Sequence, residues 1–259
     1  MAPSPFFQEN RWSQRVSVTL LLGGQVILRL LKGKLRGQPL GEQLLVAGPH
    51  ALGPVLLTNL LAGMLITLQT APELMRYGAM EGLGGTVAVV LCRELAPVLT
   101  AGIMAGQVGA VYAAELGVMR VTEQIDALHL LRTRPVDYLV LPRVVACGVM
   151  LPILTVFAIT IGLLGSAGIA QGIYGQPPQL FFDSIRLLLD RADLWIVVGK
   201  AGVFGILIAL IGCSWGLTTQ EGAKGVGRST AAVVVNLWGA IVVIDLLLSL
   251  GLSLGRGIN

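Results

Sequence analysis

Five long apolar runs constrain what this chain can fold into more than any other feature of its sequence. A bilayer core about 30 Å thick is crossed by a helix of about 20 apolar residues. Runs of this kind lie at about residues 50–70, 83–114, 139–170, 194–217 and 231–254. The second and third are too long for perpendicular spans and contain Pro97, Pro142 and Pro152, so we expect them to tilt or kink. The sequence therefore predicts an all-α integral membrane protein with five transmembrane helices.

Composition excludes the main alternative classes of protein. Hydrophobic residues make up 54% of the 259 residues and charged residues only 12%, whereas a soluble domain carries about 25% charged residues. Disordered chains are polar and rich in charge, which this chain is not. The net charge of +4 is compatible with nucleic-acid binding, but aromatic residues, at 5%, offer little for base stacking. We therefore expect no nucleic-acid partner.

The sequence predicts neither a metal site nor a cofactor bound by this chain. Cys92, Cys147 and Cys213 lie singly in apolar runs, and His50 and His129 do not form a helix-spaced pair. An odd number of isolated thiols does not make a disulfide framework or a set of metal ligands. No residues are assigned a catalytic role.

The segment before the first span is predicted to be an N-terminal interfacial amphipathic helix at about residues 9–36. Its apolar part, residues 16–31, is short, is interrupted by glycine and polar residues, and has basic residues on both sides. Such a helix lies in the headgroup region of a membrane, and the flanking charges argue against a cleaved signal peptide. We thus expect one membrane domain, residues 1–259, with a five-span bundle at about residues 50–254.

The distribution of Lys and Arg residues predicts a cytoplasmic N-terminus. With that orientation, twelve of the 18 Lys and Arg residues lie on the inner side and four on the outer side. The other two, Arg93 and Lys200, lie within spans. Cytoplasmic loops hold the excess of positive charge, so the C-terminus is expected outside after five spans.

Four ionisable residues lie inside the predicted spans: Arg93, Glu94, Lys200 and Asp245. Each costs about 2.5–3.5 kcal/mol at the centre of a membrane helix, so each should meet a partner or water. At 1.5 Å per residue all four lie roughly 9–15 Å from the outer ends of their spans, and their charges sum to zero. Two interpretations remain open: structural ion pairs between helices, or the polar floor of a cavity open to the outer side.

Small residues recur at four-residue spacing in the second span. One stripe contains Gly102, Gly106 and Ala110, and a second contains Ala105 and Gly109. Small residues at this spacing let helix backbones approach closely in lipid. The stripes therefore indicate close packing, either within one chain or at the seam of a homodimer.

The inner loop between the second and third spans is predicted to contain a short amphipathic helix at about residues 122–134. Thr122 can cap its N-terminus, with Glu123 in the first turn, and Pro135 ends it by restricting the preceding residue. Its apolar side consists of Ile125, Leu128 and Leu130 or Leu131. Such a helix can rest on the membrane surface or dock into a groove on a soluble partner.

The inner loop before the fifth span contains a glycine-rich sequence, residues 222–229, which is one residue away from a phosphate-binding loop pattern. That pattern binds phosphate between a strand and a helix of an α/β domain, whereas both flanks here are membrane spans. We therefore expect no nucleotide binding by this chain and interpret the segment as a tight connection.

Three stretches, in this order, resemble the MlaE-type permease subunits of lipid-transporting ABC systems. They read CRELAPVLTAGIMAGQVGAVYAAELGVMRVTEQIDAL, DYLVLPRVVA and CSWGLTTQEGAKGVGRST. The last is especially similar to the cyanobacterial and chloroplast-envelope branch, the trigalactosyldiacylglycerol permease relatives. The resemblance covers nearly the whole chain after about Gly41.

The resemblance implies a permease homodimer that moves phospholipid or a related polar lipid and is not itself an enzyme. It implies separate cytoplasmic ATPase subunits, which hold ATP and Mg²⁺, and an Mce-domain substrate-binding protein outside. It also implies a bacterial inner or plasma membrane, cyanobacterial in type, or alternatively the chloroplast inner envelope.

The resemblance also assigns roles to individual residues. The intramembrane polar positions near the lipid cavity are matched by Arg93, Glu94, Lys200 and Asp245. The coupling helix at the ATPase contact is matched by Glu123, Gln124, Ile125, Asp126, Ala127 and Leu128. The chain departs from the family at Gln107, where arginine is usual, and in the turn RTRPVD, where a glycine-acidic-proline form is usual.

Two rival functions are weighed against the lipid permease. A proton-coupled secondary transporter could use Glu94 or Asp245 as proton carriers, but the inverted repeats common in such transporters are absent from the sequence. A membrane scaffold without a transport pathway would not need charges clustered at one depth of the bilayer.

Overall fold

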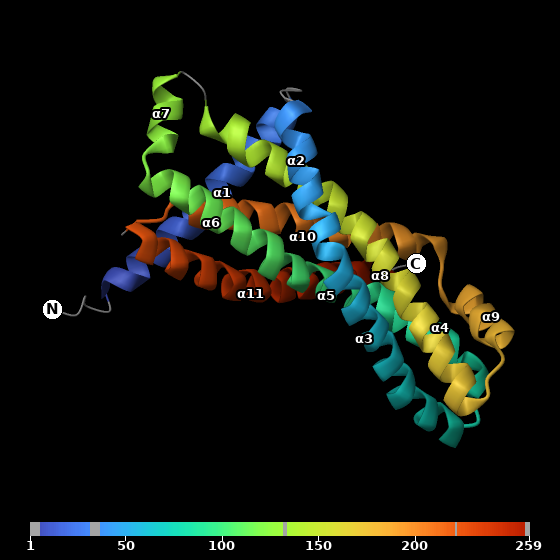
Figure 1. Ribbon diagram of the computed structural model, residues 1–259. Coiled ribbons are helices and arrows are strands. Elements are labelled where there is room, and N and C mark those ends of the chain that lie inside the picture. The colour runs from blue at the N-terminus through green and yellow to red at the C-terminus, as the bar shows by residue number, and fades with distance from the viewer. Residues whose placement is uncertain (1–5, 32–36, 132–133, 221, 257–259) are drawn as a thin grey trace. The chain divides into compact units, whose positions relative to one another are not determined.

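The computed structural model describes residues 6–31, 37–131, 134–220 and 222–256, and every regular element among them is helical (Figure 1). The N-terminal elements are α1 (Phe6–Leu31), α2 (Gly37–Ala47) and α3 (Pro49–Arg76). A 3₁₀ turn at Met80–Gly82 precedes α4 (Leu83–Val90), α5 (Ala96–Met104) and α6 (Ala110–Val121), which π-helical turns at Leu91–Leu95 and Ala105–Gly109 join into one continuous segment. The remaining elements are α7 (Gln124–Leu130), a π-helical turn at Val136–Val140, α8 (Leu141–Tyr174), α9 (Pro178–Leu188), α10 (Arg191–Leu217) and α11 (Gly222–Arg256).

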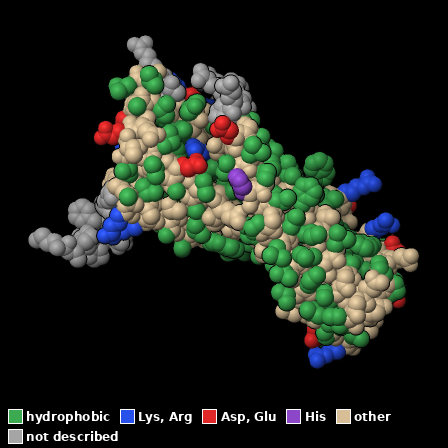
Figure 2. All heavy atoms as spheres, viewed as in Figure 1, with side chains coloured by type: hydrophobic (Ala, Val, Ile, Leu, Met, Phe, Trp, Pro, Cys, Tyr) green, Lys and Arg blue, Asp and Glu red, His purple; other side chains and the backbone are tan. Residues whose placement is uncertain are grey.

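The five predicted spans are confirmed in the described part of the chain. Segments long and apolar enough to cross a membrane are Leu40–Arg76, Met80–Val121, Val136–Tyr174, Arg191–Leu217 and Gly222–Leu254. They extend beyond the predicted runs because the helices continue into polar flanking residues that a search for apolar runs leaves out. Figure 2 shows hydrophobic side chains spread across the visible face, with few charged side chains among them, as expected for helices that contact lipid.

The predicted tight connection at residues 222–229 is wrong, because these residues form the first turns of α11. Gly222 has a φ of +64°, a left-handed conformation that glycine adopts without steric cost. This left-handed residue stands at the start of the helix. Ser229, at the end of the segment, is buried and accepts a hydrogen bond from Arg15 at 3.4 Å.

Contacts between Cα atoms group the chain into two compact units, and several spans contribute to both of them. The first unit consists of Met1–Ala47, Met104–Gly148 and Gly205–Ala240. The second consists of Gly48–Ile103, Val149–Phe204 and Ile241–Asn259.

In the second unit, glycines allow helix backbones to approach closely. A Cβ atom at Gly63 of α3 would lie 2.1 Å from the carbonyl oxygen of Gly162 in α8. A Cβ atom at Gly84 of α4 would lie 2.1 Å from the carbonyl oxygen of Phe181 in α9. Any larger residue would push these helices apart, because real Cβ atoms do not come so close to a backbone oxygen. The pairs α3–α8 and α4–α9 are therefore tightly packed.

In the first unit, polar contacts attach α1 to the ends of other helices. The guanidinium of Arg15 lies 5.6 Å from the ring centroid of Trp215 in α10, and Arg29 pairs with Asp137 in the π-helical turn before α8. The buried apolar residues of α1 are Leu22 and Val26, and its exposed leucines are Leu20, Leu21 and Leu28. An exposed leucine face is compatible with a helix that lies in the headgroup region. The interfacial location of α1 stays a prediction.

Candidate functional site

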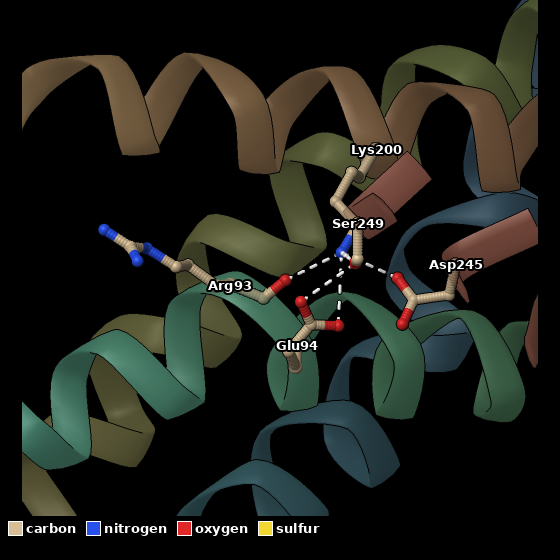
Figure 3. Close-up of polar contacts among 5 residues, drawn as sticks. All are labelled: Arg93, Glu94, Lys200, Asp245 and Ser249. Atoms are coloured by element: carbon tan, nitrogen blue, oxygen red, sulfur yellow. Dashed lines mark hydrogen bonds and ion pairs between the residues drawn. The ribbon is translucent and has the colours of Figure 1, made fainter. Parts of the chain in front are cut away.

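Charged residues from three different spans meet around the ammonium group of Lys200 in the second unit (Figure 3). Lys200 Nζ lies 2.7 Å from Asp245 Oδ1 and 3.3 Å from Glu94 Oε2. It also donates hydrogen bonds to the carbonyl oxygen of Arg93 at 2.8 Å and to Ser249 Oγ at 3.0 Å. Ser249 in turn donates to Glu94 Oε1 at 2.9 Å. We call Glu94, Lys200, Asp245 and Ser249 the lysine cluster.

The lysine cluster is closed around its cation and open at one carboxylate. The side chain of Lys200 is 4% exposed and that of Asp245 is 15% exposed, whereas that of Glu94 is 48% exposed. A buried ammonium is tolerated only when its charge is paired and its N–H groups are hydrogen-bonded, and both conditions hold here. A carboxylate as exposed as Glu94, inside a membrane span, must face water or a polar ligand rather than acyl chains.

A π-helical turn and a proline explain why the second span contributes to this cluster. Glu94 lies on the π-helical turn Leu91–Leu95, and such turns occur frequently at functional sites. Pro97 has no N–H group to donate to the carbonyl of Arg93, four residues earlier. That free carbonyl oxygen is the one that accepts a hydrogen bond from Lys200. The local sequence therefore prepares both a side-chain and a backbone acceptor for the lysine.

Arg93 points away from the lysine cluster and pairs with Asp193, in the first turn of α10 (Figure 3). Its Nε and Nη2 atoms donate to Asp193 Oδ1 and Oδ2 at 3.1 and 3.0 Å. Asp193 is almost fully buried and Arg93 is partly exposed. Bidentate pairs of this kind are among the strongest hydrogen-bonded arrangements in proteins. Adjacent residues of one turn therefore contribute to two separate ionic groups.

The sequence interpretation placed four residues together, and the structure brings three of their side chains into contact. Lys200 and Asp245, placed at similar depth, form a direct ion pair. The prediction missed Asp193, which lies one residue before the expected start of the fourth span, and Ser249. Both could have been found from helix periodicity. Asp193 lies seven residues before Lys200 and so on the same face of its helix, and Ser249 lies four residues after Asp245 and so on the same face of the fifth span.

The amphipathic helix expected at about residues 122–134 is present as α7, Gln124–Leu130. It begins two residues later than expected, and residues 132 and 133 of the expected range lie outside the described residues. The prediction that Thr122 caps it is wrong. Because α7 begins at Gln124, the residue directly before it is Glu123 and not Thr122. The Thr122 hydroxyl donates to the carbonyl oxygen of Val118, at 2.8 Å, within the last turn of α6. Glu123, with a φ of +60°, makes the turn between α6 and α7.

The residues predicted to contact an ATPase have different surroundings within the chain. Ile125 is buried, so its side chain packs inside the protein. Asp126 forms an ion pair with Arg120 of α6 at 3.0 Å, which links α7 to α6. The exposed members of the predicted set are Glu123, Gln124, Asp126 and Ala127, and Leu128 is partly buried. Two strongly exposed leucines, Leu130 and Leu131, follow directly.

The two small-residue stripes also have different surroundings. A Cβ atom at Gly212 of α10 would lie 3.0 Å from the carbonyl oxygen of Gly109, and Ala105 is fully buried. Packing within the chain therefore explains Ala105 and Gly109, and Gly102 is buried as well. Gly106 is exposed, and a Cβ atom there would meet no atom of this chain within 4 Å. A homodimer seam at Gly106 stays a prediction.

A second buried polar group, which the sequence interpretation missed, lies in the first unit. Arg143 at the start of α8 donates to Glu115 Oε2 at 2.7 Å and to the carbonyl oxygen of Leu139 at 3.0 Å. Its guanidinium lies 5.2 Å from the ring centroid of Tyr112, and the Tyr112 hydroxyl accepts a weak hydrogen bond from Cys147 Sγ at 3.7 Å. This group joins α6 to the start of α8, and these are the two helices on either side of α7.

These features define a class of protein: a polytopic helical membrane protein with networks of paired charges inside its spans. In the part of the chain that the structure describes, no group of three or more His, Cys, Asp or Glu residues could hold a metal ion. Residues 40–250 match the family model described as Permease MlaE. The chain belongs to the MlaE permease family, as the resemblance predicted.

Individual proteins similar to this chain come from cyanobacteria and chloroplasts. It is 46% identical to a probable ABC transporter permease protein of Synechocystis sp., over 95% of this chain and 94% of that protein. It is 42% identical to the chloroplastic protein TRIGALACTOSYLDIACYLGLYCEROL 1 of Arabidopsis thaliana, over 92% of this chain and 68% of that protein. A probable ABC transporter permease protein of Porphyra purpurea is 42% identical, over 89% and 88% of the two chains. These relatives confirm the predicted branch of the family and a membrane protein of bacterial or chloroplast-envelope type.

Proposed function

We propose that this chain is the membrane-spanning permease subunit of an ABC transporter that moves phospholipid or a related polar lipid between membranes. Its family and its relatives named as ABC transporter permeases support the class of transporter. The observation that carries the proposal is the lysine cluster, which presents the half-exposed carboxylate of Glu94 within a membrane span. Such a group offers a polar contact to a lipid headgroup that must leave the membrane surface during transfer.

The energy for transport comes from partner subunits in this proposal. Cytoplasmic ATPase subunits bind ATP and Mg²⁺, and the coupling helix that contacts them is α7, with its exposed Gln124 and the exposed Glu123 directly before it. Two copies of this chain form the permease, and an Mce-domain substrate-binding protein lies on the opposite side of the membrane. The location is a cyanobacterial inner or plasma membrane, or alternatively the chloroplast inner envelope.

Reconstitution tests this proposal. The chain is co-expressed with an ATPase that co-purifies with it, incorporated into liposomes, and assayed for ATP-dependent loss of a fluorescent phospholipid to acceptor vesicles. We expect transfer that requires ATP and is strongly reduced in Lys200→Met. The matched control is Glu73→Gln, which alters an exposed carboxylate paired with Arg76 at 3.1 Å, outside the lysine cluster. Absence of ATP-dependent transfer by the wild-type complex would refute the proposal.

The intramembrane carboxylates Glu94 and Asp245 also favour one alternative, a proton-coupled secondary transporter. That alternative predicts lipid transfer driven by a pH gradient in liposomes that contain this chain without any ATPase. A scaffold without a transport pathway predicts no transfer under either condition.

A further inference from the structure

We infer that the lysine cluster selects lipids whose headgroup donates hydrogen bonds, either from an ammonium or from hydroxyl groups, over lipids that end in a bare phosphate. This inference rests on the proposed function, because it assumes that the cluster faces a transported lipid. It concerns which headgroup chemistry the cluster recognises.

Neither cation of the region is available to a phosphate at the cluster. The Lys200 ammonium has three N–H groups, and four oxygen atoms of its own chain already lie within 3.3 Å of it. The guanidinium of Arg93 points away from the cluster (Figure 3) and is neutralised by both carboxylate oxygens of Asp193. A phosphate that approached the cluster would therefore displace existing partners of Lys200 before it met a positive charge.

The net charge of the cluster also disfavours a phosphate. Glu94 and Asp245 share the single positive charge of Lys200, so with both carboxylates ionised the cluster has one negative charge in excess. Inside a membrane span that excess is weakly screened, and it repels an anion and attracts a cation. The excess negative charge is most accessible at Glu94, because Glu94 is the more exposed of the two carboxylates.

The exposed atoms of the cluster are hydrogen-bond acceptors. Each carboxylate oxygen of Glu94 accepts one hydrogen bond from within the cluster, from Lys200 or from Ser249. A carboxylate has about four acceptor positions, and the Asp245 carboxyl is also a hydrogen-bonding neighbour of Glu94, so Glu94 can accept about one further hydrogen bond from a ligand. Ammonium groups and sugar hydroxyls supply such donors, whereas a fully ionised phosphate supplies none.

A competition between headgroups tests the inference. The wild-type permease complex is reconstituted with equal amounts of phosphatidic acid, phosphatidylethanolamine and a glucosyl diacylglycerol that have identical acyl chains. Lipid retained through purification in detergent is then identified by mass spectrometry. We expect the ethanolamine and glucosyl lipids to be enriched over phosphatidic acid by about fivefold, the effect of one net hydrogen bond.

Two variants locate the selectivity. Glu94→Gln removes the excess charge but keeps an acceptor, so the ethanolamine lipid should lose its advantage while the glucosyl lipid keeps most of its own. Glu73→Gln, the matched control, should change neither ratio. The wild-type comparison needs no variant and remains decisive if Glu94→Gln does not fold.

Three outcomes would overturn the inference. Equal retention of the three lipids, or a preference for phosphatidic acid, would show that the cluster does not select headgroups that donate hydrogen bonds. An ethanolamine preference that survives in Glu94→Gln would assign selectivity to other residues. Retention of none of the three lipids in the purified complex would overturn the proposed function as well, which separates failure of that proposal from failure of this one.

Discussion

At the scale of single residues, Lys200 is the centre of the second unit's polar network. From the second span it contacts the Glu94 carboxylate and the carbonyl oxygen of Arg93. From the fifth span it contacts Asp245 and Ser249. Lys200 therefore links the fourth span to the other two. Its removal would leave two carboxylates, Glu94 and Asp245, without the charge that pairs them. Removal of Asp245 would leave Lys200 still paired with Glu94.

This asymmetry gives a prediction for the buried pair. Lys200→Met and Asp245→Leu should each lower thermal stability, the lysine variant by more, because breaking a buried pair costs about 3–5 kcal/mol. The double variant should be milder than Lys200→Met, because it removes both members of the closest ion pair. Thermal unfolding in detergent of the wild type, the two single variants and the double variant measures the coupling between Lys200 and Asp245. Additive losses would show that Lys200 and Asp245 do not interact.

A second prediction concerns Arg143. Arg143→Met should lower stability by about 2–3 kcal/mol, because the side chain makes two charge-assisted hydrogen bonds in a buried location. Arg120→Met is a suitable control, since the Arg120–Asp126 pair is exposed on both sides and such pairs contribute about 0–1 kcal/mol. Chemical denaturation compares them, and equal losses would contradict a special role of the buried arginine.

At the scale of elements, prolines create free carbonyl groups that tertiary contacts then use. Pro97 frees the carbonyl of Arg93 for Lys200, and Pro72 inside α3 frees the carbonyl of Leu68, which accepts a hydrogen bond from the Tyr174 hydroxyl at 3.3 Å. Long membrane helices tolerate proline in this way because neighbouring helices satisfy the freed groups. The missing proline N–H groups therefore explain which carbonyl oxygens are free to accept hydrogen bonds from Lys200 and Tyr174.

The element α7 gives a prediction about coupling. Replacing Glu123 and Asp126 together with lysine should weaken association with the ATPase but leave membrane insertion intact, since both residues lie outside the spans. The change also breaks the Arg120–Asp126 pair, so Arg120→Met is the control that breaks this pair alone. Affinity pull-down of the ATPase measures the effect. Undiminished pull-down by the double variant would argue against the coupling role.

At the scale of the whole molecule, the proposed homodimer gives a prediction about Gly106. Gly106→Leu should reduce the dimer fraction, because it adds a bulky side chain where this chain leaves open space. Gly53→Leu is the matched control, since Gly53 is also an exposed helical glycine with open space around it. Cross-linking or single-molecule counting in nanodiscs measures the fraction. A dimer that tolerates leucine at position 106 places the seam elsewhere.

The sequence by itself determined the helical class, the five spans and the family of this protein. Hydropathy is a local property, so the runs around residues 50–254 predict spans whatever their partners are. The motifs that resemble the permease family are likewise contiguous in the sequence. Both were read correctly without any knowledge of which helices touch.

Only the tertiary structure decided which polar groups meet. Arg93 and Glu94 are neighbours in sequence, yet one pairs with Asp193 and the other with Lys200, because successive residues of a helix point in different directions. The same holds for the adjacent Ala105 and Gly106, of which one is buried and the other open. Such outcomes depend on the rotation and approach of helices that are distant in sequence, and local patterns do not contain that information.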